Sequence, residues 1–188
     1  MKIVKLVLLL LSMLFLLVGC TTNVEQELTK EEAIRLAVEG ENQLSTIVVF
    51  GQMDRNKALD PRCDSFQSED HYFTYICDAT TEADIRNKLD PFYTPKYIEE
   101  IMGDFRIQHD KNGVLAELFD GGYSQKSKDS IRNVTIEQNG NRTKAILDMY
   151  VGLDGERDVK TSKVEYEYIQ NAGWRIASNG LLFSEMKQ

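Results

Sequence analysis

The sequence is short of positive charge. It has 22 Lys and Arg residues against 30 Asp and Glu residues, which gives a formal net charge of −8. Proteins that bind the phosphates of nucleic acids need clusters of Lys and Arg, so this composition argues against a nucleic-acid partner. An acidic surface suits a basic protein or a cationic wall surface, and it is also an ordinary way to keep a protein soluble.

Histidine is scarce as well, which limits the chemistry that the chain can perform. Only His71 and His109 are present. A catalytic nucleophile needs a base within hydrogen-bonding distance. His71 precedes Cys77 at what we expect to be an exposed strand start, and His109 adjoins a predicted turn. The acidic stretches at 110–113 and 154–158 lack a full set of calcium ligands and are better explained by turns. We therefore expect no enzyme activity, no cofactor and no bound metal.

Cysteine is also rare, with three residues at Cys20, Cys63 and Cys77. Cys20 belongs to the N-terminal pattern described below, which leaves an even pair. In a compartment that permits oxidation, such a pair favours a disulfide. A Cys63–Cys77 bond would close a loop of about 14 residues and stabilise the fold by roughly 3 kcal/mol. A metal-binding or nucleophilic cysteine is the alternative, but neither residue has the spacing for it.

The longest apolar run lies at the N-terminus. Lys2 and Lys5 form a basic start, and residues 3–18 are almost entirely Leu, Val, Ile, Met and Phe. This pattern is typical of a signal peptide, and the run is short for a transmembrane span. The run ends in Leu17-Val18-Gly19-Cys20, which resembles the lipobox of bacterial lipoproteins. In those proteins the chain is cut before the cysteine, and its sulfur receives a diacylglyceryl group.

We therefore predict a signal peptide over residues 1–19, a lipid on Cys20 and a short polar tether over residues 20–27. Cleavage removes Lys2 and Lys5 and no acidic residue, so the formal net charge changes from −8 to −10. An uncleaved anchor helix is the alternative. Both interpretations place the rest of the chain outside the cytoplasm and attach it to the cell membrane.

Capping signals and apolar spacing predict three helices. Thr29 opens a capping box before a long helix that continues to about Gly51. A short helix follows Thr81, and another follows the Thr94-Pro95 pair, where an N-cap precedes proline at the first helical position. Gly103 is expected to end this third helix.

Strands are predicted in the second part of the chain, and the polar residues 53–69 before them are predicted to be a loop. Asn139-Gly140 is the strongest hairpin signal. The expected strands cover residues 72–77, 105–107, 114–118, 131–138, 142–151, 159–170 and 174–176. We expect one α+β domain over residues 28–188. The order of its elements is that of the NTF2-like/cystatin-like cone, with a long N-terminal helix and two short helices packed on a curved antiparallel sheet.

Several stretches together resemble the IseA family of peptidoglycan DL-endopeptidase inhibitors. The resembling segments are Leu28-Thr29, Tyr72–Tyr75, Lys88-Leu89, Phe92–Ile98, Asn112–Ala116, Asp120–Gly122 and Gly173–Ile176. The resemblance covers most of the chain after the signal peptide. It implies a non-catalytic, extracytoplasmic protein that binds and blocks wall-lytic cysteine peptidases through a cleft between lobes. The expected partner is therefore an envelope protein, with an NlpC/P60-type peptidase as the named candidate.

For partner binding we single out Asp120, Gly121, Gly122 and Tyr123. The two glycines permit close approach of a partner backbone, while the aspartate offers charge and the tyrosine a rigid contact. A plain loop between strands is the alternative.

Two other functions stay open at this point. The cone cavity could carry a small ligand or host an enzyme that pairs an acid with a tyrosine. The candidates for such a site are Tyr72, Tyr75, Tyr150, Tyr166, Tyr168 and Asp148. Tyrosines at alternating strand positions more often belong to the core. The chain could also be an accessory subunit of an envelope complex.

Overall fold

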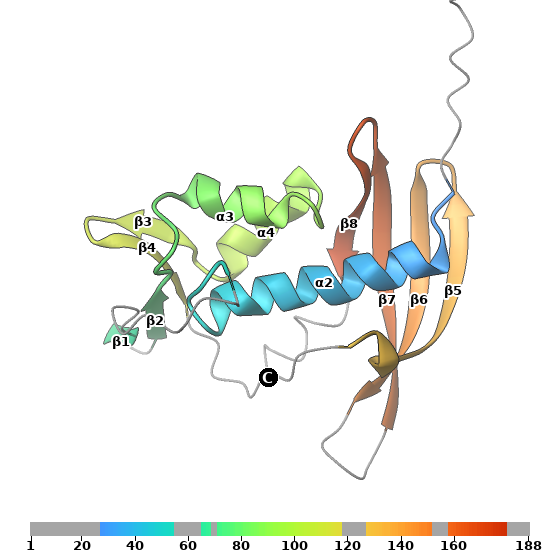
Figure 1. The fold of residues 1–188 in the computed structure, drawn as a ribbon, viewed down its shortest axis with the longest axis horizontal. Helices are drawn as coiled ribbons and strands as arrows, with labels where there is room; N and C mark the ends of the chain where they lie inside the picture. Colours follow the sequence, from blue (N-terminus) through green and yellow to red (C-terminus); the bar gives the residue numbers. More distant parts are fainter. Residues whose placement is uncertain (1–26, 55–64, 69–70, 118–126, 152–157, 180–188) are drawn as a thin grey trace, which may run out of the picture.

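The structure is a computed structural model of the chain, and it describes residues 27–54, 65–68, 71–117, 127–151 and 158–179 (Figure 1). Three α-helices lie in this part of the chain: α2 (Lys30–Val48), α3 (Glu82–Leu89) and α4 (Pro95–Asp104). None of the helices among these residues is long and apolar enough to cross a membrane. The predicted signal peptide and Cys20 lie outside the described residues.

All three helices begin at the predicted caps. The side chains of Thr29, Thr81 and Thr94 each accept a hydrogen bond from a backbone N–H group in the first turn. Such caps satisfy donors that have no partner inside the helix. At α3, Asp84 also accepts hydrogen bonds from the hydroxyl and backbone N–H groups of Thr80 and Thr81. These bonds, with those from Thr80 contributing most, lower the pKa of Asp84 to about 2.

The end of α4 differs from the prediction. The helix continues past Gly103 to Asp104, and Arg106 is the residue that takes a left-handed conformation, with φ of 45°. The N–H of Arg106 donates to the carbonyl of Gly103 (3.1 Å), and the N–H of Ile107 donates to that of Met102 (2.8 Å). This pair of bonds defines a Schellman motif, which usually has glycine in the left-handed position. An arginine there gives no stop signal, which is why the sequence did not predict this end.

The strands form two four-stranded antiparallel sheets rather than one curved sheet. Sheet A has the order β1-β2-β4-β3 and contains β1 (Ser65–Ser68), β2 (His71–Tyr75), β3 (Gln108–Asp110) and β4 (Gly113–Glu117). Sheet B has the order β5-β6-β7-β8 and contains β5 (Ile131–Asn139), β6 (Arg142–Val151), β7 (Asp158–Ile169) and β8 (Gly173–Asn179). The α+β class is confirmed, and the NTF2-like cone stays a prediction. Residue alternation shows which side of a strand is buried, but it does not show which strands pair.

One strand lies in a segment that we predicted to be a loop. Within residues 53–69, Ser65–Ser68 form β1, which pairs antiparallel with β2 and places Phe66 opposite Phe73. The four residues of β1 are too few to show a period of their own. The aromatic strand beside them therefore determines that they are extended.

Helix α2 lies along both sheets (Figure 1). Its N-terminal half packs on sheet B, where the hydroxyl of Tyr166 donates a hydrogen bond to the carbonyl of Ala33 (2.8 Å). Its C-terminal end meets sheet A, where the N–H of Cys77 donates to the carbonyl of Gly51 (3.0 Å). Gly51 has φ of 60°, and a Cβ on it would lie 2.8 Å from Oγ1 of Thr74. A single buried apolar core consequently contains residues of α2 and of both sheets.

Gly40 marks the point where α2 crosses the connection between α3 and α4. The residue is buried, and a Cβ on it would lie 3.1 Å from both Cβ of Phe92 and the hydroxyl oxygen of Tyr93. The missing side chain lets the two segments approach closely. The helix therefore tolerates a poor helix former at its centre because packing requires it.

We expect Gly40→Ala to lower the free energy of unfolding by about 1–3 kcal/mol, because the added methyl group overpacks a tight contact. Gly103→Ala is the matched control, since a Cβ at that helical position meets nothing within 4 Å and alanine is the better helix former. Urea unfolding of both variants measures the difference. Equal stabilities for the two variants would contradict the close crossing.

Candidate functional site

The predicted binding residues Asp120, Gly121, Gly122 and Tyr123 lie outside the described residues, but both ends of their segment are described. Strand β4 in sheet A ends at Glu117, and the next described residue, Ser127, leads to β5 in sheet B. The segment that contains the candidate residues therefore connects the two sheets.

On sheet A, the segment starts from a fixed strand end. The N–H of Glu117 donates to the carbonyl of Phe105 (2.8 Å), which extends the pairing of β3 and β4 beyond its last regular pair. Across the same pair, Nε of Arg106 lies 3.3 Å from Oε2 of Glu117. The Arg106 side chain is 51% exposed, so water screens this ion pair and its contribution to stability is small. The backbone bond holds the strand end, and the arginine stays accessible.

On sheet B, the segment ends in a capped turn. The hydroxyl of Ser127 accepts a hydrogen bond from the N–H of Asp129 (3.0 Å), and the hydroxyl of Ser130 accepts one from the N–H of Ser127 (3.3 Å). These bonds close the 3-10 helix η1 (Lys128–Ser130), which contacts α2 and β6. Both ends of the connecting segment are thus fixed on packed elements.

A second junction joins the helical layer to sheet B. Tyr93, in the connection between α3 and α4, forms a parallel bridge with Ile176 on β8. The N–H of Thr94 donates to the carbonyl of Ile176 (2.9 Å), and the N–H of Ile176 donates to that of Phe92 (2.8 Å). Nε of Arg175 donates to the carbonyl of Asp90. The connection consequently behaves as a short additional strand at the β8 edge of sheet B.

Helix α2 has a network of charged side chains close enough to Arg175 on β8 to feel its charge. Arg35 donates from Nε and Nη2 to the two carboxylate oxygens of Glu32, each at 2.9 Å, and from Nη1 to Glu39 at 2.9 Å. The hydrogen bonds from Arg35 lower the pKa of Glu32, and the charge of Arg175 on β8 lowers it further. Both side chains of the Arg35–Glu32 pair are 36% exposed, so this network adds little stability.

The tyrosines considered for a cavity enzyme do not converge on one site. Tyr72 on β2 is 50% exposed. Tyr75 donates to Asp110 (2.9 Å), the last residue of β3. Tyr166 is buried under α2 and bonds to the backbone carbonyl of Ala33. Two of the candidates therefore belong to sheet A, and the third belongs to the core on sheet B.

The remaining described candidates also have structural partners. Tyr168 packs edge-on against Trp174, with ring centroids 5.5 Å apart. Asp148 accepts a hydrogen bond from Thr161 (2.8 Å) at an exposed position on sheet B. The side chain of Tyr150 lies outside the described residues. In the described part of the chain, Asp110 is the acid that bonds to one of these tyrosines, Tyr75, and this pair lies on a different sheet from Tyr166 and Tyr168.

The cysteines and histidines are the other residues that could carry catalysis or bind a metal. Cys77 follows β2 and is half-buried, while Cys63 and the side chain of His71 lie outside the described residues. His109 is exposed on β3. Among the residues that the structure describes, no three His, Cys, Asp or Glu side chains are grouped so that they could hold a metal ion.

The protein is therefore an α+β protein with two sheets. One long helix packs on both sheets, and a segment whose two ends are fixed connects them. Residues 24–179 match the IseA DL-endopeptidase inhibitor family, and the chain belongs to this family. The match includes both sheets and all three described helices, which confirms the resemblance inferred from the sequence. A comparison with curated proteins found no match.

Sequence reasoning missed one exposed feature beside the connecting segment. Arg106 is accessible, left-handed and paired across the strands with Glu117. The nearest signal in the sequence is Gly103, which predicted a helix end at almost the right place. Nothing in the sequence indicated that a charged side chain would occupy the left-handed position.

The Cys63–Cys77 disulfide stays a prediction, and the position of Cys77 explains why it would matter. The backbone N–H of Cys77 bonds to Gly51 at the end of α2, so a disulfide there would tie residues 55–64 to the junction of α2 and sheet A. We expect the intact protein to be lighter by two hydrogens than its reduced form, with a stability loss of about 3 kcal/mol on reduction. Non-reducing mass spectrometry and urea unfolding with and without reductant measure both. Rapid alkylation of two thiols in the native protein would contradict the bond.

Proposed function

We propose that this protein binds and inhibits peptidoglycan DL-endopeptidases and so limits cleavage of the cell wall. The observation that carries the proposal is the family match over residues 24–179, because it spans the whole two-sheet fold rather than one motif. The proposed partner is an NlpC/P60-type peptidase. The protein itself acts by binding and not by catalysis.

The geometry supports inhibition by occupation of a groove. An inhibitor concentrates its binding energy in a few rigid residues, and the loop that presents them must keep its shape. The connecting segment meets this condition at its ends, because Glu117 is bonded into sheet A and Ser127 caps η1 beside α2. Asp120 and Tyr123 lie between these two fixed points in the sequence.

We further propose that the protein works while attached to the outer face of the cell membrane through a lipid on Cys20. The support is the lipobox-like ending Leu17-Val18-Gly19-Cys20 after a short apolar run. The family match begins at residue 24, just after this segment. Attachment would hold the inhibitor at the inner edge of the wall, where newly exported peptidases emerge.

Inhibition can be tested with the acyl-free domain, residues 24–188. We expect it to slow peptidoglycan cleavage by a purified NlpC/P60-type endopeptidase. Asp120→Ala and Tyr123→Ala should each weaken inhibition roughly 5- to 150-fold, since each removes one central contact of about 1–3 kcal/mol. Inhibition constants from peptide-release assays measure this effect.

Glu137→Ala is the matched control, because it also removes one negative charge but lies on the outer edge strand β5. It should inhibit as the wild type does. Unchanged cleavage with wild-type domain in large excess over several such peptidases would refute the proposed function. Normal inhibition by both loop variants would refute only the assignment of the loop.

Lipidation is tested separately in cells. Cys20→Ser removes the sulfur that receives the diacylglyceryl group, so the precursor should stay uncleaved and unlabelled by a radioactive fatty acid. Cys77→Ser serves as the control and should be processed normally. Maturation of the Cys20→Ser variant at the wild-type size would show that the N-terminal segment is cut by another route.

A further inference from the structure

The last turn of α4 contains a glycine that no neighbouring atom requires. Gly103 is an exposed helical residue, and a Cβ on it would meet nothing within 4 Å. Glycine is the least favourable residue in a helix apart from proline, because it loses the most backbone freedom on folding. Gly40 in α2 has a packing reason for its missing side chain, whereas Gly103 has none within the described residues.

Three residues later, a residue other than glycine occupies a position that favours glycine. Arg106 occupies the left-handed position of the Schellman motif at φ of 45°, where glycine would have no steric cost. Its backbone bond to Gly103 and the following bond from Ile107 to Met102 would also form with glycine at 106, since they use only main-chain atoms. The arginine is therefore not needed for the fold of this turn.

Exchanging the two residue types would make this turn more stable, with alanine at 103 and glycine at 106. Positions where local rules are broken with little gain in stability tend to be functional, and the half-exposed ion pair of Arg106 with Glu117 contributes little. Both residues are exposed on one end of a single helix, and each has a distinct use in recognition. Gly103 leaves backbone uncovered for close approach, and Arg106 presents a planar fork that matches a carboxylate.

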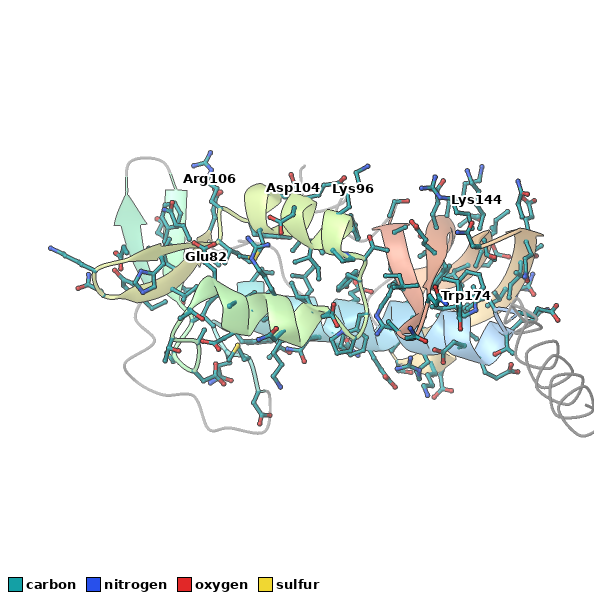
Figure 2. The ribbon with its side chains drawn as sticks, turned by 90° about the horizontal axis from the view of Figure 1, so that it is seen from above. Glu82, Lys96, Asp104, Arg106, Lys144 and Trp174 are labelled. Carbon is teal, nitrogen blue, oxygen red and sulfur yellow. The ribbon has the colours of Figure 1, made fainter. Side chains whose placement is uncertain are left out.

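We infer that Gly103, Asp104 and Arg106 form a contact surface, the α4-end surface, that docks a carboxylate-bearing segment of the inhibited peptidase. The inference rests on the proposed function and names a place on the inhibitor where that partner binds. Figure 2 shows Asp104 and Arg106 along one edge of the molecule, with the Arg106 side chain directed away from the ribbon.

The charges around Arg106 favour a specific partner over a generally acidic one. The exposed part of α4 contains Glu99, Glu100 and Asp104, and Glu117 lies 3.3 Å from Nε of Arg106. A uniformly acidic surface would be repelled here. A peptidase segment with one Asp or Glu side chain, placed against Arg106 and surrounded by neutral or basic residues, would match this surface.

The experiment measures stability and binding on the same four variants of the acyl-free domain. These are Gly103→Ala, Arg106→Gly, Arg106→Lys and, as control, Lys163→Ala on the exposed face of β7. Thermal unfolding gives Tm. Surface plasmon resonance against an immobilised, catalytically inactive NlpC/P60-type peptidase gives Kd in the absence of peptidoglycan, so a carboxylate of the wall peptide cannot contribute.

We expect Gly103→Ala and Arg106→Gly to raise Tm by about 2–4 °C and to weaken binding about tenfold each. Arg106→Lys should leave Tm unchanged and still weaken binding, because lysine keeps the charge and loses the fork. Lys163→Ala should change neither quantity.

Three outcomes distinguish a wrong function, a wrong surface and a purely structural role for Arg106. A wild-type domain that binds and inhibits no peptidase refutes the proposed function and this surface with it. Wild-type binding with unchanged Kd for Gly103→Ala and Arg106→Gly refutes the surface alone. A lower Tm for Arg106→Gly would show that the ion pair with Glu117 holds the turn, and it would remove the argument for a functional arginine.

Discussion

The rest of the structure depends on helix α2, because this one helix packs against both sheets. Sheet A and sheet B do not share a strand, so each must cover its apolar face with something else. Helix α2 covers part of sheet B, where Ala33 accepts a hydrogen bond from Tyr166, and the residues just after the helix bring Gly51 against Thr74 on sheet A. A helix of 19 residues is about 28 Å long, which is long enough to serve two sheets side by side. The single apolar core follows from this shared helix.

The junction of the α3–α4 connection with sheet B and the end of β4 in sheet A are fixed by backbone hydrogen bonds and not by charge. The bridge between Tyr93 and Ile176 and the bond from Glu117 to Phe105 are main-chain interactions at packed positions. The ion pairs near them, Arg35 with Glu32 and Arg106 with Glu117, are a third to a half exposed on the arginine side and contribute little. The fold therefore depends little on these two ion pairs.

Local features of the fold could be predicted from the sequence, and pairings between distant segments could not. Thr29, Thr81 and Thr94 identified the three helix starts because a cap acts within one turn. The division into two sheets depends on which hairpins meet in space, and strand alternation carries no information on that. Arg106 was missed for a related reason, since a left-handed arginine has no signature in the sequence. Residues 120–123 and the cysteine pair were proposed from residue type alone, and of these the structure describes only Cys77.

The direction of α2 also determines how far the molecule can reach. The helix begins beside sheet B and ends beside sheet A, so a chain held at its N-terminus is held by the sheet B end (Figure 1). Sheet A and the end of α4 then lie at the far end of a stiff arm of about 28 Å. In a chain anchored through the proposed lipid on Cys20, rotation about the anchor would sweep that end through a hemisphere of roughly this radius, whereas the sheet B end would stay near the point of attachment.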